Sequence, residues 1–137
     1  MTEQKNLLIV DADGAILGRL SSFVAKQSLL GKNVIVVNCS EAIISGERRM
    51  VIKRYQIERG RGGSSLKGPH FPKDPERIVK RTITRMLSYT QGRGRTASKR
   101  VICHNDIPIE YKDVPKIKAG RSKPIKSIKL SELEREL

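Results

Sequence analysis

Two short apolar runs, separated by about the length of one helix, constrain the fold of this chain most. The runs are Leu7–Val10 and Val34–Val37, and uninterrupted apolar residues are typical of strands covered on both faces of a parallel sheet. Between the runs, apolar residues recur at helical spacing: Leu17, Leu20, Phe23, Val24 and Leu30. A strand, a helix and a strand of this length form the usual right-handed parallel crossover. The first part of the chain therefore predicts an α/β domain.

Polar residues and glycines predict where the neighbouring elements begin and end. Asp13 is expected to cap the first helix, and Gly31 is expected to end it. Ala42–Ile44 is a third short apolar run, and a basic helix of poor amphipathicity is expected over Glu47–Glu58. We expect Arg59–Lys73 to be loop, because glycine and proline interrupt any periodicity there.

The clearest helix signal begins at Asp74. This residue is the expected cap, and Pro75 is the expected first helical residue. Apolar residues as far as Leu87 share one side of the helix and basic residues share the other. The basic residues are Arg77, Lys80, Arg81 and Arg85. Like charges in a row along a helix repel one another, so this face predicts an anionic partner.

The next segment gives weaker signals. Gly92–Arg95 is expected to break the helix, and Thr96–Arg100 is expected to add one more turn. Val101–Cys103 reads as a final short strand. Together the elements predict a three-layer α/β/α fold with a small four-stranded, mainly parallel sheet, plus basic loops and an extended C-terminal tail.

A length of 137 residues suits one compact domain. We expect this α/β domain to span residues 1–107. Prolines at positions 108, 115 and 124 predict that residues 108–137 form an extended basic tail without regular structure. A short terminal helical turn is expected at the capping-box sequence Ser131–Glu134.

Positive charge is concentrated in one part of the chain. The whole sequence carries a net charge of +14, yet residues 1–47 carry −1 and residues 48–129 carry +17. Such an excess excludes a near-neutral metabolic enzyme as the default interpretation and favours a polyanionic partner. The apolar runs are too short to cross a membrane, and no signal-peptide core follows the polar first residues. We therefore expect a cytoplasmic protein with no membrane partner and no small-molecule substrate.

The sequence offers little support for a cofactor, a metal or a catalytic group. The glycines after the first strand do not have the spacing of a dinucleotide fingerprint, and no acidic residue follows the second strand. The cysteines and histidines do not match a zinc spacing. Cys39 and Cys103 both end strands, so a disulfide between them stays open, although such bonds are uncommon in the cytosol.

The basic segments predict nucleic-acid binding, and the aromatic residues indicate its mode. Phe71, Tyr89 and Tyr111 are scattered along the sequence and predict no stacking platform for single strands. We expect contacts with the phosphates of folded RNA, made by arginine side chains and by glycines that allow close approach. The expected RNA-binding residues are Arg48, Arg49, Lys53, Arg54, Arg59, Gly60, Arg61, Gly62, Gly63, Lys67, His70, Lys73, Arg77, Lys80, Arg81, Arg85, Arg93, Arg95, Lys99, Arg100, Lys116, Lys118, Arg121, Lys123 and Lys126.

Several motifs of the chain, taken together, are characteristic of one protein family. They are Val10–Ser22, Gly31–Asn33, Val36–Asn38, Ala42–Gly46, Pro75–Thr82 with Met86-Leu87, Gly92–Arg95 and Lys99–Val101. Over about residues 7–111 the chain resembles the large-subunit ribosomal protein L thirteen family. Its short second-to-third strand connection and its Gly68–Phe71 sequence resemble the archaeal or eukaryotic branch, and its length of 137 residues favours the shorter archaeal form. One departure is Arg85–Ser88, where the family usually has Gly-Met-Leu-Pro. The change predicts a helix that runs further and carries an extra phosphate contact.

The resemblance implies a structural role without catalysis. Members of the family bind large-subunit rRNA during assembly and stay in the subunit beside neighbouring ribosomal proteins. Two alternatives remain open from the sequence. One is an RNA-acting or nucleotide-dependent enzyme, and the other is a basic chromatin-type protein that binds DNA.

Overall fold

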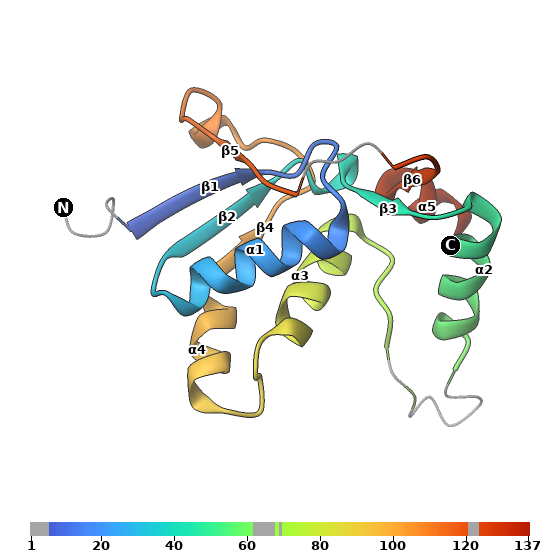
Figure 1. The fold of residues 1–137 in the computed structure, drawn as a ribbon, viewed down its shortest axis with the longest axis horizontal. Helices are drawn as coiled ribbons and strands as arrows, with labels where there is room; N and C mark the ends of the chain where they lie inside the picture. Colours follow the sequence, from blue (N-terminus) through green and yellow to red (C-terminus); the bar gives the residue numbers. More distant parts are fainter. Residues whose placement is uncertain (1–5, 62–67, 69, 121–123) are drawn as a thin grey trace.

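A four-stranded parallel sheet lies at the centre of the computed structural model, which describes residues 6–61, 68, 70–120 and 124–137 (Figure 1). The strand order is β4-β2-β1-β5. The strands are β1 (Leu7–Asp11), β2 (Asn33–Val37), β4 (Val101–Cys103) and β5 (Ile117–Lys118). The two apolar runs form the two inner strands, with Ile9 opposite Ile35. The small α/β fold is thereby confirmed.

Three helices cover one face of this sheet: α1 (Leu17–Leu29), α3 (Pro75–Met86) and α4 (Gly92–Lys99) (Figure 1). Helices α1 and α3 pack against each other through fully buried residues that include Leu20, Val24, Val79 and Ile83. Each such aliphatic side chain contributes roughly 1.5–3 kcal/mol when it leaves water. This layer therefore holds most of the core. No helix among the described residues is long and apolar enough to cross a membrane.

The other face of the sheet has a thinner cover. Ile9, Ile35 and Val37 form a small buried cluster there, and Ile107 and Tyr111 pack against it. Tyr111 lies in the 3-10 helix η4 (Ile109–Tyr111). The second outer layer of the expected α/β/α arrangement therefore consists of this turn and its flanking chain rather than an α-helix.

A second, two-stranded sheet joins the middle of the chain to its C-terminal part. Strand β3 (Ile43–Ser45) pairs antiparallel with β6 (Ser127–Lys129). The short 3-10 helix η2 (Cys39–Glu41) precedes β3, the helix α2 (Arg48–Arg59) follows it, and α5 (Leu130–Glu136) follows β6. Leu130 and Leu133 of α5 are fully buried in the main core.

Two expectations about strands are wrong. The third apolar run lies in the small sheet rather than in the main one, and the fourth strand of the main sheet is β5. The chain beyond residue 107 is expected to lack regular structure, yet it forms η4, β5 and β6. The three prolines lie between these elements and not within them, so they do not interrupt any ladder. The proposed division between residues 107 and 108 stays a prediction.

The start of α1 also differs from the expectation. Its N-cap position is Ile16, so Asp13 does not cap it. Instead, the backbone N–H of Asp13 donates to Oδ1 of Asp11 at 3.0 Å, which closes a turn after β1. The helix α2 agrees with the predicted range to within one residue.

The boundaries of the later helices need three corrections. Asp74 and Pro75 occupy the expected cap and first-turn positions of α3, but this helix ends at Met86 and does not run further. The glycine-rich stretch at residues 92–95 begins α4 rather than breaking a helix. In α5 the N-cap position is Lys129, so Ser131 lies inside the first turn and forms no capping box.

Candidate nucleic-acid interface

A groove of about 600 Å³ lies between α2 and α3. Four arginines that the sequence singled out line it: Arg54, Arg61, Arg81 and Arg85. The other lining residues are Tyr55, Glu58, Phe71, Pro72, Ile78, Thr82 and Met86. One carboxylate therefore faces four guanidinium groups, so the groove is strongly positive. Segments that are distant in the sequence meet here.

His70 and Phe71, in the segment that precedes α3, are held by arginines of both helices. Arg59 at the end of α2 donates from Nη1 to the carbonyl of Phe71 at 3.1 Å. Arg81 of α3 donates from Nη1 to the carbonyl of His70 at 2.8 Å. The Arg81 guanidinium carbon lies 4.1 Å from the centroid of the Phe71 ring, which is a cation–π contact. The aromatic ring is thereby held at the groove, which Tyr55 also lines.

Many of the expected binding residues are exposed cations whose side chains make no hydrogen bond or ion pair within the described part of the chain. Such side chains can reach a phosphate without first breaking an internal contact. They are Arg49, Lys53, Arg61, Lys73, Arg85, Arg93, Lys99, Lys118 and Lys126. Gly60 is exposed at the end of α2. The expected residues Gly62, Gly63, Lys67, Arg121 and Lys123 lie outside the described residues.

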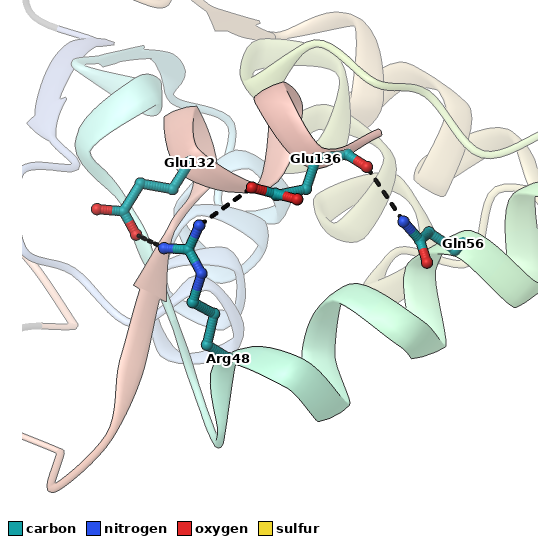
Figure 2. Close-up of polar contacts among 4 residues, drawn as sticks. All are labelled: Arg48, Gln56, Glu132 and Glu136. Atoms are coloured by element: carbon teal, nitrogen blue, oxygen red, sulfur yellow. Dashed lines mark hydrogen bonds and ion pairs between the residues drawn. The ribbon is translucent and has the colours of Figure 1, made fainter.

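Arg48 has a different environment from these free cations. Its Nη1 lies 3.1 Å from Oε2 of Glu132, and its Nη2 lies 3.2 Å from Oε1 of Glu136 (Figure 2). Gln56, two turns further along α2, donates to the backbone carbonyl of Glu136 at 3.2 Å. These contacts attach α5 to α2. All the side chains are partly exposed, so each ion pair stabilises by only about 0.2–1 kcal/mol.

Lys80 and Arg100 are half-buried, and their cationic groups donate to backbone carbonyls. Lys80 Nζ donates to the carbonyl of Val101 at 2.6 Å and to the carbonyl of Ser98. Burial lowers the pKa of Lys80 from its ordinary value of 10.5. Arg100 donates from Nη1 to the carbonyl of Ser28 at 2.9 Å. The two side chains connect α3, α4, β4 and the end of α1.

Several other expected binding residues also have internal partners. Arg54 pairs with Glu58, and Arg77 pairs with Asp74, each at 3.5 Å on an exposed surface. Arg95 donates to the carbonyls of Tyr89 and Thr90, and Lys116 donates to those of Lys112 and Val114. These cations lie at the surface, so their charge still attracts an anion.

The two cysteines are free thiols. Cys39 is buried at the start of η2, and Cys103 lies on β4, half-buried. The contact with the Cys103 thiol, together with burial, raises the pKa of the Cys39 thiol far above its ordinary value. Cys39 is therefore protonated and unreactive at neutral pH. Among the described residues, no group of three or more His, Cys, Asp or Glu side chains could hold a metal ion.

Sequence reasoning missed the apolar lining of the groove. Tyr55 and Met86 carry no charge, and their place in the sequence gives no signal that they line one groove. In the sequence Phe71 is one of three scattered aromatic residues, yet the fold brings it to the same groove as Tyr55. The arrangement becomes visible only when the positions of α2 and α3 are known.

The fold and the groove define a class: small, strongly basic α/β proteins with an arginine-lined surface between two helices. Comparison with known proteins specifies the class further. The family model described as ribosomal protein L13 matches residues 5–110. The chain therefore belongs to the ribosomal protein L13 family.

Similar curated proteins come from archaea. The chain is 46% identical to the large ribosomal subunit protein uL13 of Methanosarcina barkeri, over 81% of this chain and 79% of the relative. It is 38% identical to the protein of the same name from Thermoplasma volcanium, over 94% and 96% of the two chains. The expected resemblance to the archaeal branch is confirmed.

Proposed function

We propose that the protein is a structural constituent of the large ribosomal subunit in the cytoplasm, where it binds and stabilises folded large-subunit rRNA early in assembly. The observation that carries the proposal is the arginine-lined groove between α2 and α3, in which the exposed Arg61 and Arg85 have no side-chain partner among the described residues. Family membership supports the same conclusion.

The mechanism follows from charge neutralisation. RNA segments repel one another, and a cation between two of them lowers that repulsion. Arginine binds phosphate oxygens through two parallel hydrogen bonds, so it fixes orientation as well as charge. Each neutralised phosphate also releases counterions, which favours binding at low salt. We infer that Arg61 and Arg85 in the groove bridge phosphates and so stabilise one packing of the RNA.

A second surface suits a protein neighbour. Leu29 and Leu30 at the end of α1 are 50% and 66% exposed, and Met86 of α3 is 46% exposed. Together with Ser22, Ala25 and Lys26 these residues line a shallow, mostly apolar hollow. Apolar side chains that cluster on a surface favour contact with other proteins. This hollow supports the proposal that neighbouring large-subunit ribosomal proteins pack beside the chain.

The binding proposal is tested by removing two groove cations. We expect Arg61→Gln combined with Arg85→Gln to weaken binding to purified large-subunit rRNA. The slope of log K against log salt should fall by just under one for each phosphate that the variant no longer neutralises. Filter binding or fluorescence anisotropy over a salt series measures both quantities. The matched control is Arg19→Gln with Lys32→Gln, which removes two exposed cations away from the groove.

Equal slopes in the two double variants would exclude the groove as the RNA site. The wider proposal is tested by sedimenting a native cell extract through a high-salt gradient. A constituent of the large subunit travels with that particle after the salt wash. A protein that stays at the top of the gradient is not one, and its basic surface would then be compared for binding to duplex DNA and to free RNA.

A further inference from the structure

We propose that the groove between α2 and α3 receives one unstacked base of the RNA, in addition to the phosphates that its rim binds. The inference rests on the proposed function and names the part of the ligand that enters this site. It arises from the chemistry of the groove, which differs from that of a surface made only for a backbone.

The lining of the groove combines apolar and aromatic groups with charged ones. A phosphate backbone requires cations but no apolar surface, and yet Tyr55, Phe71, Ile78 and Met86 all line this site. Its volume of about 600 Å³ lies in the usual range for sites that bind small organic groups, roughly 300–1,000 Å³. A nucleobase is flat and largely apolar on its faces, so it matches such a lining.

A rigid stacking surface is already assembled in the groove. The guanidinium of Arg81 lies over the Phe71 ring at 4.1 Å, and its Nη1 is held by the carbonyl of His70. Bases stack on aromatic rings and on guanidinium planes in proteins that bind unpaired RNA. Because internal contacts already fix both groups, little side-chain freedom is lost on binding.

Two polar groups are placed to meet the edge of a base. The hydroxyl of Tyr55 makes no hydrogen bond within the described residues, and burial raises its pKa above 10, so it keeps its proton. It can donate to a ring nitrogen or a carbonyl oxygen. The carboxylate of Glu58 lines the same groove and can accept from an exocyclic amine.

The rim supplies the contacts for the sugar-phosphate chain on either side of such a base. Arg61 and Arg85 are exposed, have no internal partner among the described residues and line the groove. A base can enter only where it is not paired. The ligand is therefore a nucleotide in a loop or a bulge of the folded RNA.

The experiment separates stacking from charge. We expect Phe71→Leu, which keeps the net charge and removes the ring, to lower affinity for purified large-subunit rRNA by roughly 5-fold to 100-fold. The salt slope should not change, because the same phosphates stay bound. Phe71→Tyr keeps the ring and should restore affinity to near that of the wild type. Thermal melting of each variant checks that the fold is intact.

A chemical probe of base reactivity identifies the nucleotide directly. In the complex with the wild-type protein, one unpaired base of the rRNA should be protected, and Phe71→Leu should abolish that protection. If Phe71→Leu binds like the wild type while Arg61→Gln with Arg85→Gln binds more weakly, the groove holds backbone only and this inference is wrong. If neither variant changes binding, the proposed RNA site itself fails.

Discussion

The surroundings of each cation decide what it does in this protein. Arg48 is neutralised by two carboxylates of α5, so its charge stabilises a contact between helices. Lys80 donates to two backbone carbonyls at the junction of α3, α4 and β4. Arg85 has no partner among the described residues and faces the groove. Only the third kind can bind a phosphate while every internal contact stays in place.

Lys80 gives a test of this distinction. Lys80→Met leaves the carbonyls of Ser98 and Val101 without their donor, so we expect the free energy of unfolding to fall by about 1–2 kcal/mol. The salt slope for RNA binding should stay the same, because the ammonium does not reach a phosphate. Urea unfolding and a salt series measure the two effects. The exposed Lys73→Met should show the reverse pattern, and a slope that drops in Lys80→Met would place this residue in the interface.

At the scale of elements, a strong local pattern predicts an element correctly and a weak one does not. The unit β1–α1–β2 is predictable from the sequence because two apolar runs flank a segment with helical periodicity. The helix α3 is predictable because Pro75 follows a residue that is typical of helix caps. The helix α4 is not predictable, because two of its first three residues are glycines and glycine has a low helix propensity. The strands β5 and β6 have two and three residues, too few for any pattern to appear.

The packing of α4 explains why one of its glycines is required. A Cβ at Gly94 would lie 2.0 Å from the backbone oxygen of Ser88, whereas a Cβ at Gly92 would meet nothing within 4 Å. We expect Gly94→Ala to destabilise the protein by at least about 2 kcal/mol, because backbone must move. Gly92→Ala, in the same helix, should be neutral or slightly stabilising. Thermal melting of the pair measures the difference, and equal melting temperatures would contradict the close approach of α4 to this turn.

At the scale of the whole molecule, the charges of the site are predictable from the sequence but its shape is not. The charge and the helix pattern of the sequence are sufficient to predict that the four groove arginines bind RNA. They are Arg54, Arg61, Arg81 and Arg85. No local pattern says that α2 faces α3, because their positions depend on contacts of α5 and of the loop at His70 and Phe71 with these helices. The groove therefore becomes visible only in the folded molecule.

The C-terminal part of the chain contributes core residues, and one leucine measures how much they matter. Leu133 of α5 is fully buried, whereas Leu30 is 66% exposed. We expect Leu133→Ala to lower the free energy of unfolding by about 2–5 kcal/mol, because it leaves a cavity. The chemically identical change Leu30→Ala should cost at most about 0.5 kcal/mol. Chemical denaturation of both variants tests this, and a small effect at Leu133 would mean that α5 adds little to the core.

The late position of Leu133 has a consequence for the synthesis of the protein. A chain emerges from its ribosome N-terminus first, so β1, β2, α3 and β4 are exposed before β5 joins the sheet and before α5 completes the core. During that interval a nascent chain with many unneutralised cations is surrounded by the RNA of the particle that makes it. Completion of the core is thus coupled to the synthesis of α5, and a chain that stops short of α5 lacks the core residues Leu130 and Leu133.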